Sequence, residues 1–592
     1  MVKKQQPMGH SEMPITLADL LLGFCLRQPD DTILDPGCGE GKFLQRVEQW
    51  LQWLAAVPAD IADDPLWGVE QDQELVRKCY DRLPNAHVIN QNYFAQEPET
   101  WPQFDLVAGN LPYAPTQSIG RLTKRRARQL PLFPDEDQSL PDSEKLRLVS
   151  QKLADSLGGR AGLHAYYFLH SEPFLKEGGR LGFVVPNGWL DVAYGVELKQ
   201  YLLDHFQILA IVESSVERWF PQSSVNTCLV ILAKCGVWRR RQGNLVRLVR
   251  LRQPLRDLFP GNAASPQRFV SVEQMVSKLM SGYSHESGAY GVHVMEQGSL
   301  RAAGKWGKAL RAPAVYRRHR DHLDLHTLKR WAVVQRGYTT GANEFFYLDA
   351  AAIEQWSIEE EFRRPLLKSM RGIENLRVKA SDCRHELLFI RPNSDLRGTA
   401  TQAYIKWGED QGFHLRQTFR SRQPWYILPA QSPAPIVMAK GVWQRHMSPI
   451  LEDNITVDQQ LYQILPVEHV PVIAAAALLN SSWFALQIEL HGRVSLGRGL
   501  LWLATYELGQ VRLPDPRRLK EDQIEQLEKT FLGLVERPFK NGGYDLDQPE
   551  RREMDAVVFD VLNFSDSERT AVLDSLKERL HSRKQQAAYG GE

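Results

Sequence analysis

The chain of 592 residues lacks the features that define several large protein classes. None of its six cysteines stands in a C-x-x-C pair, so neither a disulfide framework nor a paired metal motif is indicated. We therefore expect reduced thiols, no metal site and a cytoplasmic location. No apolar run is long enough for a membrane span. The Ala- and Leu-rich run over residues 474–479 is too short and predicts a packed helix.

A large excess of charge of one sign is also missing, because the formal net charge is only +1. Contact with a polyanion would therefore depend on local basic patches. Three such runs are present: Lys124–Arg126 with Arg128; Arg239, Arg240 and Arg241 followed by Arg247, Arg250 and Arg252; and Arg317, Arg318 and Arg320. The ordinary interpretation of any one run is a solvated loop or helix face.

The first part of the chain shows alternating strand and helix patterns. Apolar strand patterns end at Leu34, Val69, Ile89 and Ala108, and helical patterns such as residues 71–83 lie between some of them. This alternation predicts an α/β fold with a mostly parallel sheet covered on both faces. Such sheets bind ligands at the carboxyl ends of their strands.

A glycine-rich loop follows the first of these strands. Residues 33–44 read Ile-Leu-Asp-Pro-Gly-Cys-Gly-Glu-Gly-Lys-Phe-Leu, and the glycines allow a tight turn close to a ligand. A bare glycine-rich turn also serves dinucleotide sites. Here Asp35 precedes the loop and can pair with an ammonium group, as S-adenosylmethionine has. Glu70 ends the next strand and suits ribose hydroxyls.

Two further strand ends carry polar and aromatic groups. Asn92, Tyr93 and Phe94 follow the third strand and could hold an adenine ring. The fourth strand ends in Asn110-Leu111-Pro112-Tyr113, whose amide and Leu111 carbonyl can accept hydrogen bonds from a planar amino group. The Tyr113 ring can stack on the base that carries that group.

With these motifs the chain resembles the DNA adenine-N6 amino-methyltransferases, and within them the gamma class, where the cofactor loop precedes the tetrapeptide. The resemblance implies a Rossmann-like methyltransferase sheet, the cofactor S-adenosyl-L-methionine and a flipped-out adenine in double-stranded DNA. Implied catalytic residues are Asn110, Leu111, Pro112, Tyr113 and Phe220. Phe220 stands in a Phe-Pro turn that would supply an aromatic ring to the other face of the base; the alternative is that it is an ordinary core phenylalanine. Implied cofactor residues are Thr16, Asp35, Pro36, Gly37, Cys38, Gly39, Glu70, Gln71, Asn92, Tyr93, Phe94 and Asn110.

The sequence departs from the family pattern at three points. Leu111 stands where the family usually has proline, although the carbonyl that accepts a hydrogen bond remains. Asn92 stands where Asp is usual. Met13-Pro14 replaces the usual Thr-Pro pair, and Thr16 is the nearest substitute.

From about residue 245 the βα alternation stops, and four passages resemble a TaqI-like target recognition domain. These passages cover residues 334–346, 422–426, 478–482 and 497–514. We expect a catalytic domain over residues 1–244, an α+β DNA recognition domain over 245–515 and a helical tail over 516–592. Candidate DNA contacts are Arg239, Arg240, Arg336, Thr339, Thr340 and Trp425. For the passage at 334–346 a structural hairpin is an equal alternative.

Together these features predict a site-specific adenine DNA methyltransferase of a restriction-modification or phage-defence system. We expect the protein to be prokaryotic and associated with the nucleoid. Candidate partners are a separate restriction endonuclease or other defence subunits. Alternatives are a methyltransferase for RNA adenine or protein glutamine, or a catalytically weakened DNA-binding subunit. A fused nuclease is not expected, because the cofactor motif begins near the first residue and Glu197-x-Lys199 lies on a predicted helix of the catalytic domain.

Overall fold

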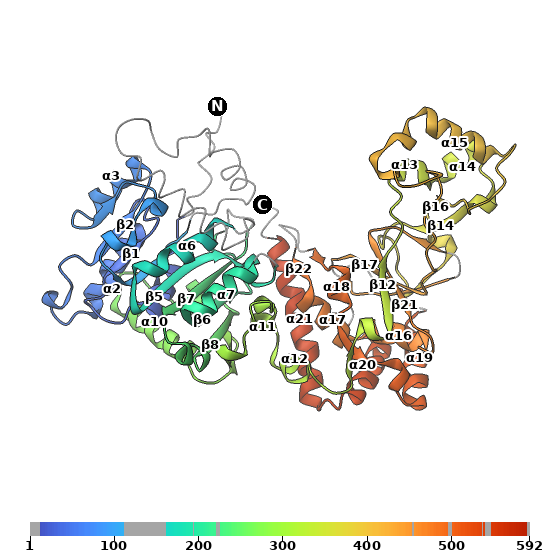
Figure 1. The fold of residues 1–592 in the computed structure, drawn as a ribbon. Helices are drawn as coiled ribbons and strands as arrows, with labels where there is room; N and C mark the ends of the chain where they lie inside the picture. Colours follow the sequence, from blue (N-terminus) through green and yellow to red (C-terminus); the bar gives the residue numbers. More distant parts are fainter. Residues whose placement is uncertain are drawn as a thin grey trace. The chain divides into compact units, whose positions relative to one another are not determined.

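The computed structural model describes residues 12–111, 162–192, 195–220, 225–443, 445–452, 455–494, 500–535, 537–538 and 546–588. The chain divides into two compact units, of which the first ends at Arg311 and the second begins at Ala312 (Figure 1).

A ten-stranded sheet forms the centre of the first unit, in the order β3-β2-β1-β4-β5-β7-β6-β8-β10-β9. Strands β1 to β5 are parallel, and β7 runs antiparallel between β5 and β6. This arrangement confirms the predicted Rossmann-like methyltransferase sheet. The strands are β1 (Ile33–Asp35), β2 (Leu66–Val69), β3 (His87–Ile89), β4 (Phe104–Asn110), β5 (Leu175–Pro186), β6 (Phe206–Ser214), β7 (Thr227–Lys234), β8 (Leu245–Leu251), β9 (His285–Glu286) and β10 (Tyr290–Glu296).

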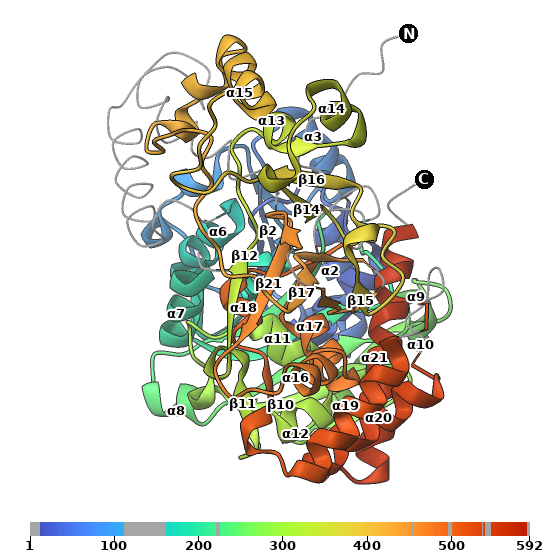
Figure 2. The same cartoon turned by 90° about the vertical axis from the view of Figure 1, so that its right-hand side faces the viewer.

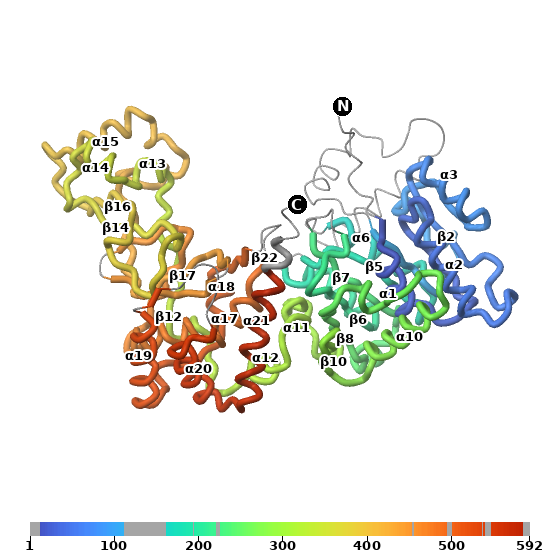
Figure 3. Tube along the Cα trace, turned by 180° about the vertical axis from the view of Figure 1, so that it is seen from behind, coloured from blue at the N-terminus to red at the C-terminus, as the bar shows by residue number. Residues whose placement is uncertain are grey.

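Helices cover both faces of this sheet, and for that reason its central strands are nearly continuous apolar runs. Figures 1 and 3 show the two faces from opposite sides. The helices of one face and its core are α1 (Ile15–Cys25), α2 (Lys42–Leu54), α3 (Gln73–Arg82), α9 (Leu255–Leu258) and α10 (Pro266–Leu279). The helices of the other are α6 (Leu163–Ser171), α7 (Gly195–His205) and α11 (Trp306–Arg311).

The sheet continues past residue 244, where the sequence placed the end of the catalytic domain. Strand β8 pairs parallel with β6, and β10 pairs antiparallel with β8. Helix α10, which lies between them in the chain, packs against α1. The boundary at residue 244 was expected because regular alternation of strands and helices stops there. The antiparallel pair β8 and β10 continues the sheet without that alternation. Residues 245–311 therefore belong with the first unit.

Two large hydrophobic cores are formed by the described residues of the second unit. The larger core joins the sheet β12-β21-β17-β19-β15 to α16, α17, α19 and α20 (Figure 2). The smaller, aromatic core joins the sheet β13-β16-β14-β20 to α13, α14 and α15. The helices of the expected tail pack on this unit: α19 packs on α16, and α21 packs on α17.

The elements of the second unit have the following bounds. Its helices are α12 (Ala314–His319), α13 (Asn343–Phe346), α14 (Ala350–Trp356), α15 (Ala400–Asp410), α16 (Val472–Leu478), α17 (Ser482–His491), α18 (Thr505–Leu508), α19 (Glu521–Val535), α20 (Pro549–Val561) and α21 (Asp566–Ala588). Its strands are β11 (Leu325–Thr327), β12 (Ala332–Arg336), β13 (Tyr347–Leu348), β14 (Arg363–Leu367), β15 (Arg377–Val378), β16 (His385–Leu388), β17 (Ile436–Ala439), β18 (Gly441–Val442), β19 (Ile450–Leu451), β20 (Thr456–Val457), β21 (Leu461–Pro466), β22 (Arg493–Val494), β23 (Leu501–Trp502) and β24 (Arg512–Pro514).

No single described helix is long and apolar enough to cross a membrane; only the bent pair α16 and α17 meets the length and composition test together.

Candidate active site

One edge of the first unit's sheet gathers most of the predicted site residues. Strands β1 to β4 run in the same direction, so Asp35, Glu70, Asn92 and Asn110 follow or end neighbouring strands at their shared carboxyl edge. Ligands bind at this edge in open α/β sheets.

Asp35 is buried at the base of the glycine loop. Its Oδ1 accepts a hydrogen bond from the Gly37 backbone N–H at 3.0 Å. Burial raises the pKa of the Asp35 carboxyl to about 7, and the charge of Glu70 adds to this rise. A Cβ at Gly109 would lie 2.5 Å from Asp35 Oδ1, so the end of β4 passes directly against this carboxyl group. Only glycine leaves room for that approach.

Glu70 is fixed by backbone donors on two sides. Its carboxylate accepts from Gly39 N at 3.1 Å and from Asp72 N at 2.8 Å. A carboxylate has about four acceptor positions, so two remain for ligand hydroxyls. Asn90, which the sequence analysis missed, donates to the Glu70 and Gln71 carbonyls at 3.0 Å each and holds this turn in place.

The three residues after β3 that the sequence singled out, Asn92, Tyr93 and Phe94, have different surroundings. Asn92 accepts from Phe94 N at 2.9 Å and so caps a short 3₁₀ turn. Tyr93 is buried, with its hydroxyl 2.9 Å from Ser171 Oγ. This ring packs in the core, which favours a structural role over direct contact with a ligand. Phe94 is partly exposed and remains the aromatic candidate for an adenine ring.

The other predicted cofactor residues surround the loop. Pro36 and Cys38 are buried, Thr16 is partly exposed in the first turn of α1, and Gln71 is exposed. Cys38 fills space below the loop, since a Cβ at Gly68 of β2 would lie 2.7 Å from its Sγ. This thiol has a packing role.

Asn110 and Leu111 stand at the end of β4, where Asn110 is in register with Val184 of β5. The Leu111 side chain is 1% exposed and packs in the core of this face. That anchor gives a physical reason why the turn tolerates leucine: apolar burial fixes a position that proline would fix through its ring. Pro112 and Tyr113 lie outside the described residues.

Phe220 does not present its ring to this edge. It precedes β7 at the correct side of the sheet, but it is 4% exposed and lies in the core with α1 and α10. The core alternative is therefore favoured over base stacking.

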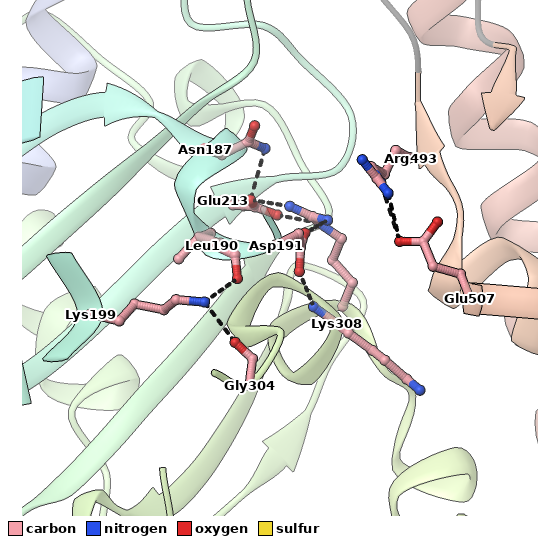
Figure 4. A network of polar contacts seen from close by, with 10 residues as sticks. Asn187, Leu190, Asp191, Lys199, Glu213, Gly304, Lys308, Arg493 and Glu507 are labelled. Atoms are coloured by element: carbon pink, nitrogen blue, oxygen red, sulfur yellow. Dashed lines mark hydrogen bonds and ion pairs between the residues drawn. The ribbon is translucent and has the colours of Figure 1, made fainter. Parts of the chain in front are cut away.

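A polar network that the sequence analysis missed supports the neighbouring strand ends (Figure 4). Asn187 follows β5 and donates to Glu213 Oε1 at 2.9 Å. Arg311 binds the same carboxylate through two contacts of 2.7 and 2.8 Å and reaches Asp191 Oδ2 at 2.8 Å. Such forked arginine pairs fix geometry in two directions. These residues were missed because they are distant in sequence and match no motif.

The Glu197-x-Lys199 pattern has no nuclease geometry. Lys199 is buried in α7, and its amine donates to the Leu190 carbonyl at 3.3 Å and the Gly304 carbonyl at 2.7 Å (Figure 4). No cluster of three metal-ligating side chains occurs in the described part of the chain.

The predicted DNA contacts Arg239 and Arg240 lie at the wrong edge. They belong to α8 (Trp238–Gln242), which follows the end of β7. Because β7 is antiparallel to β5 and β6, its end lies at the edge opposite Asn110. This placement removes the reason to assign them to DNA entering at the catalytic edge.

Two of the four candidates in the second unit are structural. Thr340 is 0% exposed and Trp425 is 8% exposed, with its indole N–H 3.0 Å from Glu409 Oε1. Arg336 and Thr339 are exposed and remain candidates. Gly337 meets a packing need, because a Cβ there would lie 2.2 Å from the Val457 carbonyl oxygen.

The edge fits S-adenosyl-L-methionine. Asp35 can take an ammonium group, Glu70 has acceptor positions for ribose hydroxyls, and Gly109 has no side chain that would separate the end of β4 from Asp35. Protein-family models agree with a methyltransferase. Residues 69–220 match the Eco57I restriction-modification methylase, residues 304–533 match the C-terminal domain of the Type II methyltransferase M.Eco57I, and residues 4–128 match the RMKL-like methyltransferase domain. S-adenosyl-L-methionine is the expected cofactor.

Individual relatives point to restriction-modification systems. The chain is similar to the Type II methyltransferase M.AccI of Acinetobacter calcoaceticus, with 22% identity over 68% of this chain and 66% of that protein. It is also similar to M.XamI of Xanthomonas campestris pv. amaranthicola, with 23% identity over 82% of this chain and 81% of that protein. These matches support a restriction-modification methyltransferase. Among solved structures, the chain is similar to the Type IIL restriction-modification enzyme MmeI, whose structure was determined in complex with DNA. The sequence identity is 13% and the TM-score is 0.48, with 95% of this chain and 75% of that chain covered.

Proposed function

We propose that this protein transfers a methyl group from S-adenosyl-L-methionine to N6 of a flipped-out adenine in double-stranded DNA, as the modification enzyme of a restriction-modification system. One observation carries the proposal. Gly109, at the end of β4, lies directly against the Asp35 carboxyl group. The acceptors of Asn110 and Leu111, which follow Gly109, therefore lie close to the carboxylate that would bind the cofactor's ammonium group.

The proposed chemistry uses positioned acceptors. When bound, the cofactor supplies an electrophilic methyl group. The Asn110 side-chain oxygen and the Leu111 carbonyl accept the two N6 hydrogens, which directs the nitrogen lone pair towards the cofactor side of the edge. The same acceptors stabilise the positive charge that develops on the nitrogen. The proton leaves after transfer, when the amine has become far more acidic, so no strong general base is required.

The DNA partner is proposed from the names of the relatives and from the second unit. Residues 304–533, most of which lie in the second unit, match a C-terminal domain model of a Type II methyltransferase. Arg336 and Thr339 are exposed there and are the proposed contacts. A separate restriction endonuclease is a proposed partner of the system.

Transfer of tritiated methyl groups to unmethylated DNA tests the function, with tRNA and protein as alternative acceptors and mass spectrometry of the product base. We expect N6-methyladenine in DNA. Asn110→Ala is expected to abolish transfer while cofactor binding is retained. Labelling of tRNA or protein alone would overturn the DNA assignment, and full activity of Asn110→Ala would overturn the mechanism.

A further inference from the structure

Tyr167 of α6 lies beside the proposed cofactor site although no sequence motif marks it. It packs in one buried cluster with Leu34, Val69 and Leu111. Leu34 and Val69 directly precede the two carboxylates of the site, and Leu111 directly follows Asn110. Tyr167 therefore belongs to the hydrophobic core that also contains these strand ends.

Two aromatic contacts fix the ring of Tyr167. It stacks on Tyr93 with centroids 5.5 Å apart and an interplanar angle of 7°. It also meets Phe94 at 4.7 Å in an edge-on arrangement. The ring thus bridges the core and the partly exposed phenylalanine that could hold adenine.

Tyr167 as a residue is only 6% exposed, and its hydroxyl makes no hydrogen bond to a described residue, yet the hydroxyl oxygen is not among the fully enclosed side-chain atoms that lack a partner. Its neighbour Tyr93 differs, because that hydroxyl bonds to Ser171 at 2.9 Å. Buried tyrosine hydroxyls usually have partners. Burial raises the pKa of the Tyr167 phenol, and the charges of Glu70 and Asp35 raise it further.

We propose that Tyr167 is a cofactor-binding residue whose hydroxyl donates a hydrogen bond to a ribose oxygen of S-adenosyl-L-methionine. The identity of this ligand rests on the proposed function. The Tyr167 ring contacts Phe94, the residue proposed for the adenine that is joined to this ribose. A donor there complements Glu70, which can only accept from sugar hydroxyls.

The test compares the hydroxyl groups of the two stacked tyrosines, Tyr167 and Tyr93. Cofactor binding to variants of the full chain is measured by calorimetric titration. Tyr167→Phe is expected to bind S-adenosylmethionine and S-adenosylhomocysteine about tenfold more weakly, by the same factor, because both ligands carry the ribose. Its melting temperature should not fall, since the hydroxyl has no protein partner. Tyr93→Phe should show the reverse: a lower melting temperature through loss of the Ser171 contact, with cofactor affinity unchanged.

Several outcomes decide against the inference. Wild-type affinity in a folded Tyr167→Phe would overturn it and leave the proposed methyl transfer intact. A lower melting temperature together with weaker binding in both variants would reduce Tyr167 to a structural residue. Absence of binding to the wild-type chain would overturn both the inference and the proposed function, whereas binding without transfer to DNA would overturn the proposed function alone.

Discussion

At the scale of single residues, the two carboxylates of the proposed site differ in their surroundings. Asp35 is buried and accepts one backbone hydrogen bond at 3.0 Å. Glu70 accepts two, from Gly39 and Asp72. A buried carboxyl group with few donors is disfavoured in its charged form until a cation arrives. Asp35 is thus the group whose charge depends on the ligand.

Cofactor affinity is expected to rise with pH because of Asp35. Its pKa in the free protein is about 7, so below that value the group is protonated and cannot pair with an ammonium. The dissociation constant should therefore fall by up to about tenfold per pH unit between about pH 5.5 and 7. Calorimetry of cofactor binding over this range measures the effect. Asp35→Asn should bind weakly and without this pH dependence, and a persistent slope in that variant would assign the titration to another group.

Gly109→Ala is expected to weaken cofactor binding by at least about tenfold, because the new Cβ would lie 2.5 Å from Asp35 Oδ1 and displace that carboxyl group. Gly288→Ala is the matched control, since nothing lies within 4 Å of a Cβ at that position. Titration of both variants with cofactor gives the comparison. Equal affinity in the two would contradict the close contact between β4 and Asp35.

At the scale of elements, one buried ionic cluster ties three helices of the first unit together. Asp19 of α1 pairs with Arg46 of α2 at 2.6 Å and with Arg268 of α10 at 2.9 Å. Trp50 donates to the same carboxylate at 3.0 Å. Because α10 lies beyond residue 244, this cluster attaches an element that the sequence had assigned to another domain.

Asp19→Asn is expected to destabilise the first unit by about 3–5 kcal/mol, because it leaves two buried guanidinium groups without their counter-charge. Urea unfolding followed by hydrogen exchange in α1 and α10 measures the loss. Asp395→Asn serves as the control, since Asp395 forms an exposed pair with Arg397 and its loss should leave the transition unchanged. An unchanged transition in Asp19→Asn would contradict the role of the cluster.

At the scale of the whole molecule, the chain builds two units with separate cores. The carboxyl-terminal residues complete the second unit. Glu489 of α17 is buried against Arg583 of α21 at 2.7 Å and His446 Nε2 at 2.7 Å. Although burial alone would raise it, the His446 hydrogen bond and the Arg583 charge lower the pKa of Glu489 to about 2.

The second unit is therefore expected to lose stability in acid. A carboxyl group with a lowered pKa stabilises the fold above its ordinary value of 4.5, and this stabilisation is lost as pH falls towards 2. The contribution is about 3 kcal/mol at neutral pH. Glu489→Gln should lower stability at pH 7 and flatten the dependence between about pH 5 and 3. Hydrogen exchange in α17 and α21 measures this loss of stability. If Glu489→Gln were as sensitive to acid as the wild type, Glu489 would not be the cause of the acid sensitivity.

The sequence alone determined which edge of the sheet carries the proposed site. Parallel strands end at one edge, so polar residues after consecutive apolar strands had to meet there, and Asp35, Glu70 and Asn110 do. The glycine loop could also be predicted, because a tight turn beside a ligand requires glycine at particular positions.

Only the tertiary structure decided which side chains face that edge. Phe220 and Tyr93 looked suited to stacking but are buried, whereas Tyr167, on a helix with no motif, contacts the partly exposed Phe94. The antiparallel direction of β7 sends Arg239 to the far edge, and no local pattern reveals the direction of a strand. Local sequence specifies turns and strand ends; the orientation of side chains and strands depends on packing between segments far apart in the chain.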